Sequence, residues 1–377
     1  MSTSIDPQPI NQHSTFVVGT SNAATLTSHV AIVVVAYNNS LDVQRCLTSV
    51  FESEDPHVHK SVVLVDNSSN NFTEQLIREQ FPSVHYVKPD QNLGFTGGNN
   101  LGFDYVKEQL PEVEYLYLLN QDTRVDSGWL EQAVVFANAH KNVGCIQSKI
   151  LLLNDESKLN TAGNRCHYLG FGFVQGCDEV DQGQYDEVRS IDFASGAAAM
   201  VRMSAIHNGQ LFDEHFFMYM EDVGLCWRLK LWNYDVVFLP TSRVFHRYEP
   251  AVDFKHYYFL ERNRLWLLLS YYKLATLLLL SPMLLLMEAG QLFFAAKLGR
   301  LHDKLRAYAY YMKPSVLRKL WHSRRAIQNS RVKSDRELLT KFSGSIDLPT
   351  LDGFLVKRVA NPIFSAYWYF AKRMITW

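Results

Sequence analysis

Two aspartates stand where apolar runs of the sequence end. Asp66 closes residues 62–66 (VVLVD), and Asp122 follows residues 115–119 (YLYLL). A carboxylate at the end of a strand can accept hydrogen bonds from a ribose or a base edge. Beside a bound diphosphate it can hold Mg²⁺ or Mn²⁺, hard ions that prefer oxygen ligands. The alternative for both is a cap of a turn or helix, but the spacing of two βα units favours a ligand-binding role for Asp122.

Glycines are concentrated in residues 92–102 (NLGFTGGNNLG). Gly94, Gly97, Gly98 and Gly102 would let the backbone approach a diphosphate closely. The stretch fits neither G-x-G-x-x-G nor the P-loop pattern. A flexible turn before a helix is therefore the alternative interpretation.

A pair of acids, Glu221 and Asp222, follows an aromatic run and opens a predicted helix within residues 213–232. In a cleft, one of the two could act as a general base. Alternatively, both satisfy the helix dipole. His246 follows a predicted strand over residues 236–239, and a lone histidine is more often structural than a ligand.

Alternating short elements must position these residues. Strands are predicted over residues 29–38, 62–66, 84–87 and 115–119, and helices over residues 41–53, 73–80 and 93–106. This alternation predicts an α/β fold with βα units and a mainly parallel sheet. In such sheets ligands bind beyond the carboxyl ends of the strands, which is where Tyr37, Asn38, Asp66 and Asp122 fall. Residues 163–176 are predicted to form a loop or hairpin.

The C-terminal third has a different chemistry. The uncharged stretch at residues 274–287 contains Pro282 and is shorter than the about 20 residues that a membrane span needs, which predicts an interfacial or re-entrant helix. Residues 300–341 hold 12 Lys and Arg against three acids. The last predicted helix, over residues 359–377, carries two adjacent apolar stripes. One consists of Phe364, Trp368, Ala371 and Ile375, and the other of Tyr367, Phe370, Met374 and Trp377.

Apolar and aromatic segments beside a basic tract are typical of a peripheral membrane contact. In the alternative, these helices pack on the catalytic domain or on a second copy of the chain.

The amino-acid composition limits the classes of fold and function that are possible. The chain has 377 residues, of which 47% are hydrophobic and 20% charged, so it can bury a sizeable core. A net charge of −1 excludes a global basic field for nucleic acid. Five scattered cysteines without a C-x-x-C pair argue against a zinc site and a disulfide framework, and Cys46, Cys145 and Cys226 are expected in the core. Residues 1–28 are predicted to be a disordered tail without signal-peptide character.

Six signatures in order resemble glycosyltransferase family 2, and within it the rhamnosyltransferase-like group. They are VVVAYNN (33–39), VVLVDNSS (62–69), NLGFTGGNN (92–100), LLNQDT (118–123), FFMYMEDVGLCWRL (216–229) and VFH (244–246). The resemblance covers about residues 30–264. It implies a nucleotide-diphospho-sugar transferase fold of the A type and an inverting sugar transfer.

The resemblance also implies roles for single residues. Tyr37, Asn38 and Asp66 would hold the nucleoside, Asn92, Gly97, Gly98 and Asn99 would border the ribose and diphosphate, Asp122 and His246 would hold Mg²⁺ or Mn²⁺, and Asp222 would be the catalytic base. Two positions depart from the family pattern. The metal motif has one carboxylate in Asn120–Asp122 instead of two, and Gly224 stands where family members often carry an acid.

These observations predict a disordered tail over residues 1–28, a catalytic domain over residues 29–264 and a helical, membrane-associating region over residues 265–377. The expected enzyme transfers a sugar, rhamnose being favoured, from a nucleotide-diphospho-sugar to a hydroxyl of a glycan or lipid-linked glycan, in polysaccharide or cell-wall biosynthesis. It would lie on an anionic membrane surface, peripheral on the cytoplasmic face. A second copy of the chain is a further candidate partner, and nucleic acid is not.

Two other functions are weighed against this one. The single-acid metal motif is compatible with a catalytically silent, membrane-associated glycan-binding scaffold on the same fold. A nucleotidyltransferase would normally need a basic glycine-rich loop near the first strand, and residues 36–39 (AYNN) supply neither glycine nor a basic side chain.

Overall fold

The computed structural model describes residues 27–68, 70–248, 256–347 and 353–377. The predicted tail over residues 1–28 therefore lies, as far as residue 26, outside the described residues. Ser28 already belongs to the first strand, one residue before the predicted domain boundary at residue 29.

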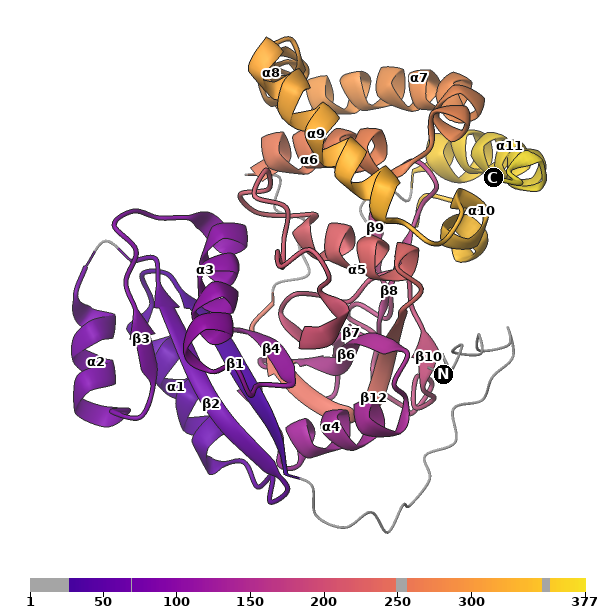
Figure 1. Cartoon of the computed structure of the whole chain (residues 1–377). Coiled ribbons are helices and arrows are strands. Elements are labelled where there is room, and N and C mark those ends of the chain that lie inside the picture. The colour runs from indigo at the N-terminus through magenta and orange to yellow at the C-terminus, as the bar shows by residue number, and fades with distance from the viewer. Residues whose placement is uncertain (1–26, 69, 249–255, 348–352) are drawn as a thin grey trace, which may run out of the picture.

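A ten-stranded sheet forms the centre of the molecule, in the order β10-β12-β6-β11-β4-β1-β2-β3, with β5 paired to β12 and β7 to β6 (Figure 1). Its first half consists of β1 (Ser28–Ala36), β2 (Val58–Asp66), β3 (His85–Val87) and β4 (Tyr115–Asn120), which pair in parallel. The connecting helices are α1 (Ser40–Glu52), α2 (Phe72–Gln80) and α3 (Gly94–Gln109). The predicted βα units are confirmed here.

The second half of the sheet is mixed rather than parallel. It is built from β6 (Val143–Leu152), β11 (Ala198–Arg202) and β12 (Asp235–His246), together with β5 (Thr123–Val125), β7 (Leu159–Thr161) and β10 (Arg189–Ser190). Strand β11 runs antiparallel to both β4 and β6, so the prediction of a mainly parallel sheet is wrong for this half. Residues 163–176 contain the predicted hairpin, formed by β8 (Asn164–Cys166) and β9 (Gly172–Val174). Helix α4 (Trp129–Ala139) precedes β6.

Helix α3 lies close on the parallel half of the sheet because of its glycines. A Cβ on Gly98 would stand 2.7 Å from Val35 Cγ1, and a Cβ on Gly102 would stand 2.6 Å from Val33 Cγ1. The glycine-rich stretch is therefore the first turns of a helix, neither an extended loop nor a flexible turn. Its glycines at 98 and 102 remove the side chains that would hold helix and strand apart.

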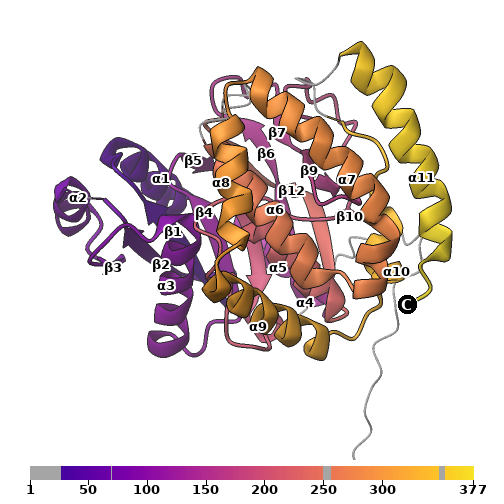
Figure 2. The same ribbon diagram turned by 90° about the horizontal axis from the view of Figure 1, so that it is seen from above.

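The C-terminal helices gather at one end of the molecule, over α5 (Glu221–Leu231), as Figure 1 shows. They are α6 (Tyr257–Tyr271), α7 (Leu274–Lys297), α8 (Leu301–Tyr311), α9 (Pro314–Ser330), α10 (Asp335–Leu338), a π-helical turn η5 (Val356–Ala360) and α11 (Asn361–Met374). Seen from above, these helices cover that end of the sheet, with α11 at the rim (Figure 2). Apolar side chains of this region, such as Leu267 and Trp368, belong to the same buried cluster as Trp227 of α5.

Helix α7 is longer than the 14 residues expected from the sequence. It runs for 24 residues through both Pro282 and Glu288 and is long and apolar enough to cross a membrane by length and composition alone. Proline leaves the Leu278 carbonyl without its helical partner, and the Ser281 hydroxyl donates to that carbonyl at 2.8 Å. Glu288 turns inward and pairs with Lys304 at 2.7 Å, so it does not end the helix.

One of the two apolar stripes predicted for the last helix packs against the rest of the protein, in the main buried cluster. Phe364, Trp368, Ala371 and Ile375 are all buried, and the Trp368 ring stacks on Tyr168 with centroids 4.7 Å apart. The packing alternative is therefore confirmed for this stripe. The second stripe remains partly open, since Phe370 and Met374 are exposed.

The basic tract over residues 300–341 is also partly internal. Lys304 is fully buried and pairs with Glu261 and Glu288. Arg331 pairs with Asp335 at 2.7 Å. Less of the charge predicted for a membrane surface is thus available there than the count of basic residues implies.

Candidate active site

The two acids at the start of α5 sit on an unusual turn. Tyr219 and Met220, just before the helix, have φ of 67° and 70°, in the left-handed region that side chains other than glycine rarely adopt. Asn263 of α6 is fully buried and donates from Nδ2 to the carbonyls of Met218 at 2.8 Å and Tyr219 at 2.7 Å. Helix α6 therefore fixes the backbone turn that precedes Asp222, the candidate base.

Asp222 accepts hydrogen bonds from backbone groups. Its Oδ1 accepts from Val223 N at 2.8 Å, and its Oδ2 accepts from Gly196 N at 3.3 Å. Loss of hydration raises the pKa of Asp222 to about 6, although these hydrogen bonds oppose the rise. Burial, followed by the neighbouring Asp222 charge, raises the pKa of Glu221 well above its usual range. Burial therefore favours the neutral form of Glu221, while Asp222, with a pKa of about 6, is ionised at neutral pH.

The glycine-rich stretch meets the acidic turn in space. Gly94 (φ 70°) lies so close to Phe217 that a Cβ would stand 2.3 Å from its carbonyl oxygen, and Thr96 N donates to the same oxygen at 3.2 Å. The Thr96 hydroxyl also donates to Glu221 Oε2 at 3.5 Å. The fold thus brings together two of the signatures that the sequence separates by more than 100 residues.

A loop of small residues, 195–197, joins the candidate base to the predicted metal motif. Gly196 N donates to Asp222, while the Ala197 carbonyl accepts from Asn120 N at 3.0 Å. Sequence analysis did not single out this loop. The run Ser-Gly-Ala-Ala-Ala after Phe193 was a visible signal, because small residues permit a close approach of backbones.

Asp122 and His246 lie side by side because β12 pairs antiparallel with β5, with His246 opposite Thr123. Asp122 Oδ1 is 3.3 Å from His246 Nε2. The other imidazole nitrogen, Nδ1, donates to Asn160 Oδ1 at 3.0 Å. That hydrogen bond leaves Nε2 as an acceptor, and Asn120 Nδ2 donates to it at 3.4 Å.

This donor set fits a divalent cation. An imidazole nitrogen oriented by a buried amide faces a carboxylate oxygen that is partly open to solvent. Mg²⁺ is commonly held by one or two carboxylates with substrate phosphates and water supplying the rest. Within the residues that the structure describes, no group of three or more His, Cys, Asp or Glu side chains forms a ready cage, so a substrate would have to complete the shell.

The predicted nucleoside residues lie at the ends of β1 and β2. Asp66 is fully buried, and its carboxylate accepts from Ser68 N at 2.9 Å, the Tyr86 hydroxyl at 2.8 Å and Lys88 Nζ at 2.9 Å. The Tyr37 side chain is half exposed. Its backbone is held by Gln121, whose Oε1 accepts from Tyr37 N at 2.9 Å.

Asn38 continues this edge. It has φ of 50°, and its N donates to Ser68 Oγ at 2.8 Å. The middle residue of the metal motif, Gln121, and the serine after Asp66 therefore fix the loop that follows β1. Sequence reasoning gave neither residue a role.

Other residues of the glycine-rich stretch are used mainly within the protein. Asn92 caps the turn before α3 by accepting from Gly94 N at 2.8 Å. Asn99 is buried and donates to the Phe95 carbonyl at 2.9 Å. Gly98 contacts Val35, and Gly97 is half-buried. Their predicted place along a ribose and diphosphate stays a prediction.

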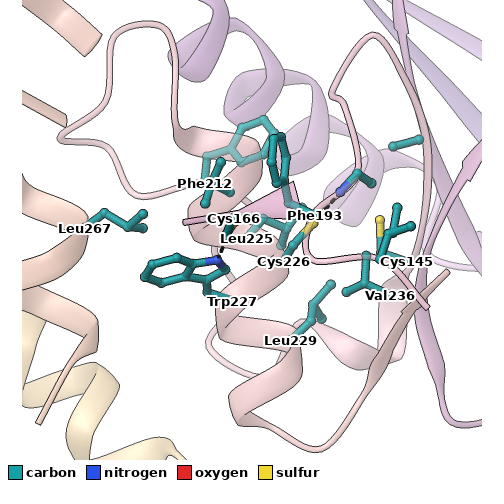
Figure 3. Close-up of a cluster of buried hydrophobic side chains, with 14 of the residues drawn as sticks. Cys145, Cys166, Phe193, Phe212, Leu225, Cys226, Trp227, Leu229, Val236 and Leu267 are labelled. Carbon is teal, nitrogen blue, oxygen red and sulfur yellow. Dashed lines mark hydrogen bonds between the residues drawn. The ribbon is translucent and has the colours of Figure 1, made fainter. Parts of the chain in front are cut away.

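Apolar side chains of α5 pack in a buried cluster with neighbouring elements. Figure 3 shows Leu225, Cys226, Trp227 and Leu229 of this helix packed among side chains from strands and from α6. Trp227 Nε1 donates to Cys166 Sγ at 3.3 Å. The predicted burial of Cys46, Cys145 and Cys226 is confirmed. The rigid core beneath the helix fixes the position of its first residue, where the acids stand.

Comparisons with known proteins agree with this arrangement. Residues 31–207 match the model of glycosyl transferase family 2. The low-salt glycan biosynthesis hexosyltransferase Agl10 of Haloferax volcanii is 23% identical over 215 residues, covering 56% of this chain and 65% of that protein. N-acetylglucosaminyl-diphospho-decaprenol L-rhamnosyltransferase of Mycobacterium tuberculosis is 24% identical over 239 residues, covering 59% of this chain and 76% of the relative.

A solved structure shares the fold. The crystal structure of GalNAc-T7 with UDP, GalNAc and Mn²⁺ superposes with a TM-score of 0.52 at 14% identity, covering 66% of this chain and 49% of that one. The A-type architecture expected from the sequence is therefore confirmed, with a mixed sheet and a helical C-terminal region.

Proposed function

Because residues 31–207 match the model of glycosyl transferase family 2, we propose that this chain is an inverting glycosyltransferase. It moves a sugar, rhamnose being favoured, from a nucleotide-diphospho-sugar to a hydroxyl of a glycan or lipid-linked glycan. The observation that carries the proposal is the loop at residues 195–197. Gly196 N of this loop donates to the Asp222 carboxylate, and the Ala197 carbonyl accepts from Asn120 N, two residues before Asp122. Base and leaving-group site are thereby held at fixed positions.

Asp222 acts as the general base. Its carboxylate takes the proton of the acceptor hydroxyl while that oxygen attacks the anomeric carbon. The bond from the anomeric carbon to the diphosphate oxygen breaks on the opposite face, and the electron pair leaves with the nucleotide diphosphate. One displacement inverts the anomeric configuration. General base assistance of this kind is worth about 10²- to 10⁴-fold in rate.

Glu221 stays protonated beside the base. Its carboxyl is buried and close to the Thr96 hydroxyl. A second negative charge next to Asp222 would be unfavourable in this partly desolvated place. The neutral Glu221 therefore leaves Asp222 as the carboxylate that accepts the proton.

Asp122 and His246 would hold Mg²⁺ or Mn²⁺, and Asn160 orients the imidazole. The bound ion would offset negative charge on the leaving diphosphate. Tyr37, Asn38 and Asp66 stand at the neighbouring strand ends, where the nucleoside is expected. Asp66 already has three partners, so we expect it to act by fixing Tyr86 and Lys88 as much as by direct contact.

The donor and setting rest on similarity. The rhamnosyltransferase named above and the resemblance of the glycine-rich stretch both favour a deoxythymidine-diphosphate rhamnose donor. That relative is named for a lipid-linked sugar acceptor, N-acetylglucosaminyl-diphospho-decaprenol, which supports a location on the cytoplasmic face of a membrane. A homo-oligomer stays an untested prediction.

The test uses Asp222→Asn in the full chain. We expect transfer from dTDP-rhamnose to fall by about 10²- to 10⁴-fold, while the thermal shift caused by the donor is retained, because the amide keeps the shape of the carboxylate. Asp104→Asn, an exposed change on α3, is the matched control and should behave as wild type. Near-wild-type transfer by Asp222→Asn at saturating donor would overturn the base assignment. Absence of donor hydrolysis by the wild type with every nucleotide sugar and Mn²⁺ would favour the scaffold instead.

A further inference from the structure

A pocket of about 610 Å³ begins at Asp222 and extends into the C-terminal helices. Its walls come from Leu260 of α6, Met287 and Phe294 of α7, and Phe364 of α11. These four residues lie outside the part of the chain that matches the family model, whereas Phe171 and Phe193 of the lining lie inside it. Its volume falls in the range of about 300–1,000 Å³ that is usual for small-ligand sites. The pocket thus adds a compartment to the candidate active site.

Glu261 and Arg264 line this wall and belong to an ion-pair network that extends to Glu288 and Lys304, which do not line the pocket. Arg264 pairs with Glu261 at 3.1 Å and with Glu288, and Lys304 pairs with Glu288 at 2.7 Å and with Glu261. Two cations and two anions leave no net charge to hold a polar ligand. In the described part of the chain, Asp222 accepts from backbone N–H groups and pairs with no cation. Most of the other residues that line the pocket are apolar.

The other end opens onto an apolar surface. Leu286, Leu355 and Ile363 line the pocket and yet are 45%, 68% and 44% exposed. Beside them on α7, Leu285 and Phe293 are more than two-thirds exposed. An exposed apolar surface is therefore continuous with the lining of the pocket that contains Asp222.

We propose that this pocket binds the hydrocarbon chain of a membrane lipid whose polar head carries the acceptor hydroxyl. The inference rests on the proposed function, because it uses Asp222 as the base. A soluble glycan has no apolar part to fill such a pocket, whereas a lipid chain matches its walls and its opening. The bound hydrocarbon chain of the lipid would fix the distance of the acceptor hydroxyl from Asp222. The pocket therefore selects lipid-linked acceptors.

Gly290 gives a direct way to close the pocket. It lines the pocket on α7, and a Cβ built on it contacts no heavy atom within 4 Å. The variant Gly290→Trp can therefore place an indole in the pocket mouth without displacing backbone. Ala289→Trp is the matched control, because it adds the same side chain at the adjacent exposed position, which does not line the pocket.

A second pair of variants uses charge. Ile363→Arg places a cation in the lining of the pocket, whereas Phe370→Arg does so two helical turns farther along the same face of α11, outside the lining. Both positions are exposed, so neither substitution needs to disturb the core. Circular dichroism and the melting temperature check the folding of all four variants.

The experiment measures binding of dimethylallyl, geranyl and farnesyl diphosphates to the full chain by titration calorimetry. These probes share a headgroup and differ in chain length, and each buried methylene strengthens binding about fourfold. We expect wild type, Ala289→Trp and Phe370→Arg to bind the farnesyl probe at least about tenfold more tightly than the dimethylallyl probe. Gly290→Trp and Ile363→Arg should lose this dependence on chain length.

Several outcomes would overturn the proposal. A wild type that binds all three probes equally has no hydrocarbon site. A folded Gly290→Trp that keeps the wild-type dependence places the site elsewhere, and equal losses in the control variants show a nonspecific surface effect. Donor hydrolysis and the donor thermal shift, measured on the same samples, test the proposed function separately. If wild type shows neither donor hydrolysis nor a donor thermal shift, the proposed glycosyltransferase activity is refuted. The binding of the three diphosphate probes is then judged independently of that activity.

Discussion

At the scale of single residues, the candidate site depends on the different protonation of two adjacent carboxyls. Glu221 is buried, and this burial raises the pKa of its carboxyl well above the usual range. Asp222 is partly open and accepts hydrogen bonds from two backbone donors, Val223 N and Gly196 N. Those donors stabilise the carboxylate, and desolvation opposes it. The balance puts the pKa of Asp222 near the range in which a base is ionised and still basic.

The first prediction is a pH dependence of turnover. The raised pKa means that Asp222 becomes protonated at about pH 6 as the pH falls, where an ordinary aspartate would still be ionised. The rate at saturating donor and acceptor should therefore decrease about tenfold per pH unit below that value. The donor thermal shift over the same pH range is the control and should change little. A flat rate down to about pH 4 would contradict the assignment.

The second prediction concerns Asn160, which positions His246 through its hydrogen bond. Replacing it with alanine frees the imidazole to rotate or change tautomer. Since partners behind a metal ligand typically contribute about 10- to 100-fold to affinity, Asn160→Ala should raise the Mn²⁺ concentration for half-maximal rate by about that factor. Saturating Mn²⁺ should restore most of the maximal rate.

Two controls accompany this variant. Asn138→Ala, on α4 and hydrogen-bonded to Tyr115, should leave the Mn²⁺ titration unchanged. Asp122→Ala should lose metal dependence together with most activity. Full activity of Asp122→Ala in the presence of a chelator would show that transfer needs no metal.

The family resemblance allowed Asp222, Asp122 and His246 to be chosen, because each lies within one of its signatures. It could not indicate Asn160 or Asn263. Asn160 lies 86 residues from His246, and Asn263 lies 44 residues from Tyr219. Such partners are defined by strand pairing and helix docking, which local patterns do not specify.

At the scale of elements, the same contrast holds. Three of the four parallel strands, β1, β2 and β4, were predictable because their central residues form continuous apolar runs. Strand β6 was missed because Gln147, Ser148 and Lys149 lie in its middle, although all are buried. Their polar groups are satisfied by distant partners, for instance the Lys149 ammonium by Asp181 at 2.8 Å. No window of local sequence contains that information.

The third prediction tests how closely α3 lies on the sheet. In Gly98→Ala the new Cβ would stand 2.7 Å from Val35 Cγ1, so overpacking should lower the free energy of unfolding by about 1–3 kcal/mol. Gly290→Ala is the matched control, because its Cβ meets open space and alanine is the better helix former by roughly 0.8–1 kcal/mol. Urea unfolding measures both.

Adding Val35→Ala to Gly98→Ala should recover part of the lost stability if the clash is the cause. An unfolding midpoint for Gly98→Ala equal to that of wild type would show that the helix can move away from the strand at little cost. In that case the glycine would have to be explained by ligand approach, as the sequence resemblance suggests.

At the scale of the whole molecule, the C-terminal helices do two things at once. Their inner faces complete the core under α5 and hold the turn before it through Asn263. Their outer faces carry exposed apolar residues on α7 and on α11, such as Leu285 and Phe370. One region therefore links the candidate base to an apolar surface, which is the arrangement expected if the acceptor arrives from a membrane.

The last prediction is binding of the full chain to anionic vesicles, measured by flotation. With Lys304 and Arg331 internal, the electrostatic part must come from exposed residues such as Arg318 and Arg325 of α9. Each is worth about 1 kcal/mol near an anionic surface, so Arg318→Gln and Arg325→Gln should each weaken binding about fivefold. Arg45→Gln, exposed on α1 at the other end of the sheet, should have no effect.

Salt should reduce vesicle binding without abolishing it, because screening leaves the apolar contribution of α7 intact. The double variant Leu278→Ser, Leu285→Ser should remove the vesicle binding that remains at high salt. Both side chains are exposed and contribute little to the core, so the fold should be kept. Failure of wild type to float with anionic vesicles at low salt would contradict the membrane interpretation. The exposed face of α7 would then need another protein surface to cover it, and a sedimentation measurement would have to find the chain as an oligomer.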